Sequence, residues 1–103
     1  MKDPREVIAE NFDGDSELYE DYVHACRNQF QRDAATGDAA CERADHGALQ
    51  RLAHSVKGVL ALLGDADGAA EALTVETSAA QQVEVSGAWQ RLRARLLAYV
   101  PAS

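Results

Sequence analysis

Apolar residues recur every three or four positions along most of the chain, a spacing that places them on one face of an α-helix. One such stripe predicts a helix from about residue 16 to residue 34. Its members fall at intervals of four: Leu18, Tyr22, Cys26 and Phe30. No segment alternates polar and apolar residues over the length of a strand. The pattern therefore predicts an all-α fold.

The strongest stripe runs from residue 46 to residue 63 and predicts a helix with one apolar and one polar face. The apolar face comprises Leu49, Leu52, Ala53, Val56, Val59, Leu60 and Leu63. The opposite face comprises Gln50, Arg51, His54, Lys57, Gly58 and Ala61. Gly64 follows at the position where a glycine commonly ends a helix. We therefore expect His54 to point to solvent or to a partner, away from the core.

Shorter signals place two further helices in the first half of the chain. Asp3 and Pro4 are typical of a helix start, and a turn over residues 11–15 keeps this N-terminal helix short. A break at residues 36–38 predicts a separate short helix that Asp38 caps and that ends near Ala44. The long stripe of the preceding helix would therefore end near residue 34.

Two more helices are expected in the second half. The first has a weaker apolar face that comprises Ala69, Leu73, Glu76, Ala80 and Val83. The last begins with Ser86 as its N-cap, and Pro101 stops it. Its stripe comprises Trp89, Leu92, Leu96 and Val100. Together the segments predict an antiparallel four-helix bundle with a short additional N-terminal helix, forming one domain over residues 1–103.

The charge of the chain restricts its partners. Ten Lys and Arg residues against seventeen Asp and Glu residues give a formal net charge of −7. A nucleic-acid-binding protein would show a basic patch, and an anionic membrane surface would repel this chain. The longest apolar run, residues 59–63, is too short to cross a bilayer, and no apolar signal region follows the N-terminus. We expect a cytoplasmic protein that binds another protein, not nucleic acid or membrane.

The two cysteines, Cys26 and Cys41, lack the spacing of a metal site. They fit small core residues in a reducing compartment, and a disulfide between them is the less favoured alternative. Together with His24 and His46 they form a set that could suggest zinc, but without a recognised paired spacing. We therefore expect no bound metal.

The polar face of the helix over residues 46–63 carries three residues that phosphoryl transfer would use. A neutral imidazole offers a nucleophilic ring nitrogen at His54, and the nearby ammonium of Lys57 disfavours the imidazolium. Lys57 could then balance the charge of a bound phosphoryl group. A glycine inside a helix costs about 1 kcal/mol relative to alanine, so Gly58 indicates a need for clearance. Close helix packing is the alternative explanation for Gly58, and its place on the polar face disfavours it.

The segment Leu52-Ala53-His54-Ser55-Val56-Lys57-Gly58, with Gly64 ten residues after the histidine, resembles the signature of histidine-containing phosphotransfer (HPt) domains. An aspartate before the histidine helix and the pair Val75-Glu76 also fit that family, and the resemblance covers about residues 14–100. The family often has other residue types at three positions of this chain: Val59, Leu62 and Gly68. These departures leave the histidine, the lysine and the glycine of the signature intact.

The resemblance implies a phosphorelay intermediate in a bacterial two-component system, without kinase activity of its own. A receiver-domain aspartate would donate its phosphoryl group to His54, which would pass the group to another receiver. Lys57 would be the charge partner of the phosphate and Gly58 would give clearance. The docking surface would include Gln50, Arg51, Ser55 and Ala61.

The same resemblance implies which proteins bind the chain and where a metal ion would be bound. The receivers would belong to response regulators or to hybrid histidine kinases. Mg²⁺ would be bound by the receiver, so the chain needs no cofactor, and we expect it to be a monomer.

Other classes of protein fit less of the sequence. A binding-only module of the same shape would dock receivers without accepting phosphate, and the intact His54 and Lys57 argue against it. The phosphoacceptor region of a histidine kinase usually has an acidic residue directly after the histidine, where this chain has Ser55. A hydrolytic or metal enzyme would need convergent carboxylates, or a nucleophile with a base at a suggestive spacing. The sequence shows neither.

Overall fold

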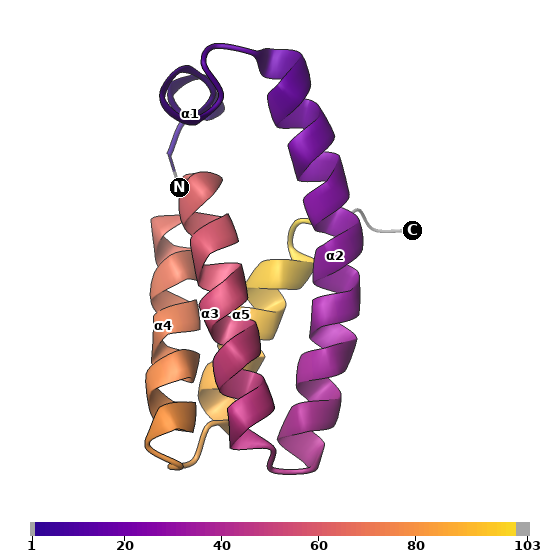
Figure 1. Ribbon diagram of the computed structural model, residues 1–103, viewed down its shortest axis with the longest axis vertical. Helices are drawn as coiled ribbons and strands as arrows, with labels where there is room; N and C mark the ends of the chain where they lie inside the picture. The colour runs from indigo at the N-terminus through magenta and orange to yellow at the C-terminus, as the bar shows by residue number, and fades with distance from the viewer. Residues whose placement is uncertain (1, 101–103) are drawn as a thin grey trace.

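The computed structural model describes residues 2–100 and confirms an all-helical chain (Figure 1). The helices are α1 (Pro4–Asn11), α2 (Ser16–Glu42), α3 (His46–Leu62), α4 (Ala66–Ala80) and α5 (Ser86–Leu97). The described residues contain no strand. None of the helices in this part of the chain has the length and apolar character needed to cross a membrane.

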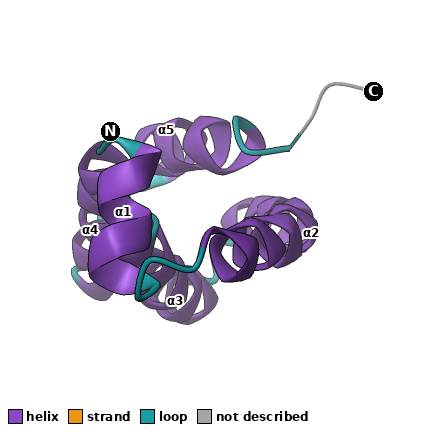
Figure 2. Cartoon of the chain, turned by 90° about the horizontal axis from the view of Figure 1, so that it is seen from above, coloured by secondary structure: helices purple, strands orange, loops and turns teal. Residues whose placement is uncertain are grey.

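The helices α2 to α5 run in alternating directions (Figure 1). α2 packs against α3 and α5, and α4 also packs against α3 and α5, with the most extensive contact between α3 and α4. The short α1 lies across one end, above α3 and α4 (Figure 2). The Asn11 side chain donates a hydrogen bond to the Leu62 carbonyl at 2.8 Å, which fastens α1 to the end of α3.

Aspartates begin four of the five helices. Asp3, Asp15, Asp45 and Asp65 each accept a backbone N–H from the first turn of the helix that follows. This contact satisfies a donor that the helix itself cannot pair, and the negative charge suits the helix N-terminus. The aspartates therefore define where α1 to α4 begin.

The N-cap of the fifth helix is not the predicted residue. Ser86 was the predicted N-cap, but it is the first residue of α5, and Val85 precedes it without a side-chain cap. The Glu84 carboxylate accepts the Ser86 N–H at 2.6 Å, so Glu84 pairs a free backbone donor at the start of α5. The predicted stop at Pro101 lies outside the described residues.

The predicted break at residues 36–38 is wrong, because α2 continues through it to Glu42. Gly37 is buried, and a Cβ atom built on it would lie 2.0 Å from Cη2 of Trp89. The glycine therefore allows the indole of α5 to approach the backbone of α2. Asp38 does not cap a helix. It accepts hydrogen bonds from Trp89 Nε1 at 2.9 Å and from Arg93 Nε at 3.0 Å.

The interior is built from the stripe of α3 and from large side chains of α2 and α5. The fully buried side chains include Phe30, Leu49, Leu60, Trp89, Leu92 and Leu96. The predicted faces of α3 are confirmed, with Leu52 and Val59 half-buried at its edges. The stripe of α2 is confirmed only in part, because Leu18 is exposed in the first turn of the helix.

The predicted face of α4 is wrong by about one position. The residues that α4 buries are Gly68, Ala72, Val75 and Ala79. Leu73, from the expected face, is 50% exposed. The buried face of α4 consists mostly of small residues, because α4 packs closely on α3. The larger Leu73 therefore lies at the edge of the contact.

Gly68 is explained by a buried polar contact. Asp65 is fully buried and accepts hydrogen bonds from the Gly68 N–H and the Tyr99 hydroxyl, both at 2.9 Å. A Cβ atom on Gly68 would lie 2.6 Å from this carboxylate. Burial raises the pKa of Tyr99, and the hydrogen bond to Asp65 raises it further. A residue with a side chain would therefore collide with the Asp65 carboxylate at this position.

Both cysteines are free thiols in the structure. Cys26 is buried in the core, and Cys41 is half-buried with its sulfur 3.8 Å from the Ser86 hydroxyl. Burial raises the pKa of the Cys26 thiol.

Candidate functional site

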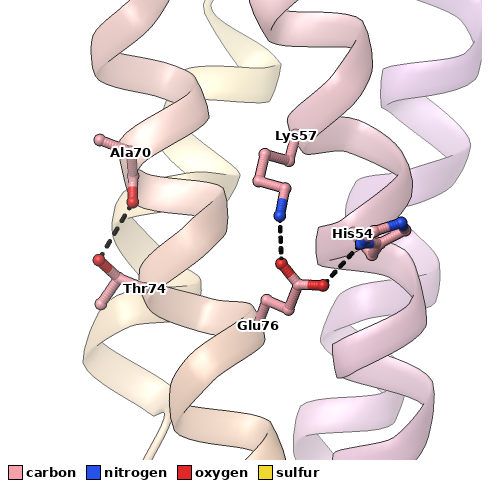
Figure 3. Close-up of polar contacts among 5 residues, drawn as sticks. All are labelled: His54, Lys57, Ala70, Thr74 and Glu76. Carbon is pink, nitrogen blue, oxygen red and sulfur yellow. Dashed lines mark hydrogen bonds and ion pairs between the residues drawn. The ribbon is translucent and has the colours of Figure 1, made fainter.

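A three-residue polar cluster lies on the seam between α3 and α4 (Figure 3). The Glu76 carboxylate contacts His54 Nδ1 through one oxygen at 2.7 Å and Lys57 Nζ through the other at 2.6 Å. The imidazole is 71% exposed, whereas the carboxylate is only 18% exposed. The imidazole is therefore accessible to a partner, and the mostly buried Glu76 carboxylate holds it in position.

The positions of the three side chains follow from helix geometry. Residues three apart on a helix share a face, which places His54 and Lys57 together on α3. The turn between α3 and α4 reverses the chain, and α4 then runs back along α3. This reversal brings Glu76 opposite the histidine and the lysine, although it follows His54 by 22 residues.

Glu76 remains ionised because both neighbours stabilise its charge. The hydrogen bond from Lys57 lowers the pKa of this carboxyl group most, and the hydrogen bond from His54 lowers it further. An ionised carboxylate only accepts hydrogen bonds, so the proton in the contact at 2.7 Å belongs to His54 Nδ1. In the neutral tautomer that carries this proton, the lone pair lies on Nε2, for which residues 2–100 supply no hydrogen-bond partner. Nε2 is therefore the ring nitrogen that is free to act as a nucleophile.

The structure changes the electrostatic role assigned to Lys57. From the sequence, its ammonium was the expected neighbour of the imidazole, but the charged group in contact with the ring is the Glu76 carboxylate. Lys57 is paired with that carboxylate and is 32% exposed. It therefore reaches the ring only through the Glu76 carboxylate.

Gly58 has no packing role within the chain. A Cβ atom built at this position would have no neighbour within 4 Å, so the close-packing explanation is wrong. The residue leaves the outer face of α3 flat beside His54. This geometry agrees with clearance for a partner.

We expect Gly58→Ala to stabilise the fold by about 1 kcal/mol, because alanine costs less than glycine inside a helix and has free space here. The free energy of unfolding in urea, measured for the variant and the wild type, checks the prediction. A loss of stability would show that the position is packed.

The four predicted docking residues do not lie on one flank of α3. Ala61 faces α4, where it lines a hollow of about 490 Å³ with Lys2, Gly64, Ala66 and Ala69. Gln50, Arg51 and Ser55 are exposed. Ser55 directly follows His54, which turns it by about 100° toward the opposite flank. Ala61 thus lies on the flank of α3 that faces α4, and Ser55 points toward the opposite flank.

Glu76 is the site residue that sequence reasoning missed. In the sequence, the pair Val75-Glu76 contributes to the family resemblance, but nothing there assigns Glu76 a role in the site. One signal was present in the sequence: Glu76 is the only charged member of an otherwise apolar stripe on α4. A charge at such a position needs a partner, and here the partners are His54 and Lys57.

The site offers an exposed nucleophilic nitrogen, a carboxylate that orients the ring and a nearby ammonium. Within residues 2–100, no three His, Cys, Asp or Glu side chains are grouped so that they could hold a metal ion. Comparisons of the chain with protein-family models, with curated proteins and with solved structures found no match.

Proposed function

We propose that this chain is a histidine-containing phosphotransfer domain that carries a phosphoryl group on Nε2 of His54. The contact of 2.7 Å between Nδ1 and the Glu76 carboxylate supports the proposal most strongly, because it leaves Nε2 free and exposed. The helix arrangement supports it as well: we interpret it as an antiparallel four-helix bundle, α2 to α5, with the short α1 added at one end.

The reaction begins with attack of the Nε2 lone pair on the phosphorus of a receiver's aspartyl phosphate. The N–P bond forms, the P–O bond to the aspartate breaks, and the aspartate leaves as a carboxylate. The imidazole keeps its proton on Nδ1 and gains positive charge. The Glu76 carboxylate stabilises this charge, as a buried acid stabilises an imidazolium in other histidine sites. The reverse steps pass the group to a second receiver.

Lys57 serves the phosphorylated state. A phosphoryl group on Nε2 adds negative charge beside an ammonium that is already within reach of the same carboxylate. The positive charge of Lys57 is then shared between two anions, the phosphoryl group and the Glu76 carboxylate. This attraction favours the phosphorylated state, and because Lys57 is shared, it does not hold the phosphoryl group tightly. Such balance suits a carrier that must also release the group.

The chain itself needs to supply little more than position and charge, because phosphoryl transfer depends mainly on these. The partner class we propose is the receiver domain of a response regulator or of a hybrid histidine kinase. Mg²⁺ would be bound by that receiver. A binding-only module is the competing function, and it differs in one result: it docks receivers but takes no phosphate.

A transfer assay against a panel of phosphorylated receiver domains tests the proposal. We expect label to move from at least one receiver to this chain, and the labelled product to lose phosphate in acid and keep it in alkali, as a phosphohistidine does. A folded chain that binds a receiver but acquires no label would establish the binding-only module instead.

We expect Glu76→Gln to slow transfer to His54 on the order of tenfold or more, because a neutral amide cannot stabilise the positive ring. Initial rates from one phosphorylated receiver check this. Lys57→Ala should also slow transfer while receiver binding persists.

The matched control is Glu71→Gln on the same helix, since Glu71 pairs with Arg91 of α5 and not with the histidine. Equal rates for Glu76→Gln and Glu71→Gln would remove Glu76 from the mechanism.

A further inference from the structure

The seam that holds the polar cluster also carries exposed apolar side chains. We call Ala69, Leu73 and Ala80 the α4 stripe. They lie three or four residues apart in series with Glu76, so they share its flank of α4, and Glu76 contacts α3. Leu73 is 50% exposed and has no place in the core. At the end near α1, the stripe continues into the apolar hollow lined by Ala61 and Ala69. An isolated exposed leucine is ordinary, but one beside a hollow and a reactive group indicates an interaction surface.

Leu73 neighbours the polar cluster along the surface of α4. It precedes Glu76 by three residues, so it is a direct neighbour of Glu76 along the helix surface. Glu76 in turn contacts the imidazole of His54 at 2.7 Å. A donor must bring its phosphorus to about 3 Å from Nε2, and a stable protein partner covers about 800 Å² of surface. A donor that reaches Nε2 over the α3–α4 seam therefore covers Leu73 as well.

The charge around the seam favours an anionic partner surface. The chain has a net charge of −7, yet α3 contains no Asp or Glu and carries Arg51 and Lys57. The only acid in the cluster, Glu76, is paired with the ammonium of Lys57, which balances its charge. An acyl phosphate with its surrounding acids would be repelled by most of this protein and accepted at this face.

We infer that the receiver domain docks over α4, with an apolar patch seated on the α4 stripe and its phosphoaspartate above His54. The inference rests on the proposed function and deepens it, since it places the docking surface on α4. The surface expected from the sequence consisted of α3 residues alone. Leu73 is the central contact, and Gly58 and Ala61 keep the α3 side of the seam low enough for the approach.

Leu73→Glu tests the inference, with Leu18→Glu as its matched control. Leu18 is 53% exposed on α2, so both variants place the same charge on an exposed leucine position. Each protein is labelled by a phosphorylated receiver and, separately, by phosphoramidate, which phosphorylates Nε2 with release of ammonia and needs no docking. For Leu73→Glu, we expect the ratio of the two initial rates to fall by about tenfold or more, as for a central interface residue. For Leu18→Glu, the ratio should stay unchanged.

Three results would overturn the inference, and they differ from one another. Equal ratios for Leu73→Glu and Leu18→Glu would place docking away from α4 and leave the proposed function intact. A wild-type chain that accepts phosphate from no receiver would remove the function itself. A wild-type dimer in sedimentation that becomes monomeric in Leu73→Glu, with the transfer ratio unchanged, would assign the stripe to self-association.

Discussion

His54→Gln is expected to abolish phosphoryl uptake and to leave the fold intact. Glutamine has no nucleophilic ring nitrogen, so neither a phosphorylated receiver nor phosphoramidate can label it. The side chain is 71% exposed and makes one described hydrogen bond, so the free energy of unfolding should change by less than about 1 kcal/mol. Label incorporation and far-ultraviolet circular dichroism, measured on the same samples, check the two parts.

The two other histidines provide the control for this variant. His24 is exposed on α2 and His46 is half-buried at the start of α3, and neither belongs to the cluster. His24→Gln should retain the full label. Label that persists in His54→Gln would move the phosphoacceptor elsewhere, and loss of helical signal would contradict an exposed ring.

Gly37→Ala is expected to destabilise the fold by about 2 kcal/mol, although alanine favours helices. The added Cβ atom would lie 2.0 Å from Cη2 of Trp89, which is fully buried. The Trp89 ring cannot move aside freely, because its N–H donates a hydrogen bond to Asp38, the residue that follows Gly37 in α2. Overpacking of this kind costs about 1–3 kcal/mol, more than the ~1 kcal/mol gained in helix propensity. Urea denaturation measures the difference.

Gly58→Ala is the natural comparison, since both glycines lie inside helices and only Gly37 faces a neighbour. The two substitutions should change stability in opposite directions. Similar changes in both would mean that the Trp89 ring relocates at little cost, and that Gly37 is not required for the packing of α5 on α2.

Local patterns predicted most of the helices because the physical causes are local. The aspartates that start α2 and α3, and Gly64 with its φ of +79° after α3, act within a few residues of their own position. The amphipathic pattern of α3 likewise fixed which face is buried, and His54 came out on the correct side. Candidate chemistry that lies on one strong helix can therefore be located from the sequence.

The errors came from contacts between segments far apart in the chain. Gly37 resembles a helix break until Trp89 is placed against it. The face of α4 was misassigned because small residues form its buried side, and hydrophobicity alone favours the larger Leu73. Glu76 reaches His54 only through the packing of two helices. Neither propensity nor periodicity contains this information.

The site depends on the relative position of two helices, α3 and α4. The signature segment of α3 supplies the histidine, but the carboxylate that contacts its Nδ1 belongs to α4. A slip of α4 by a single residue would shift Glu76 by about 1.5 Å along α3 and break a contact of 2.7 Å. Grafting the seven-residue signature onto another helix would therefore transfer the histidine without the carboxylate that orients its ring. The proposed site belongs to the α3–α4 hairpin and not to α3 alone.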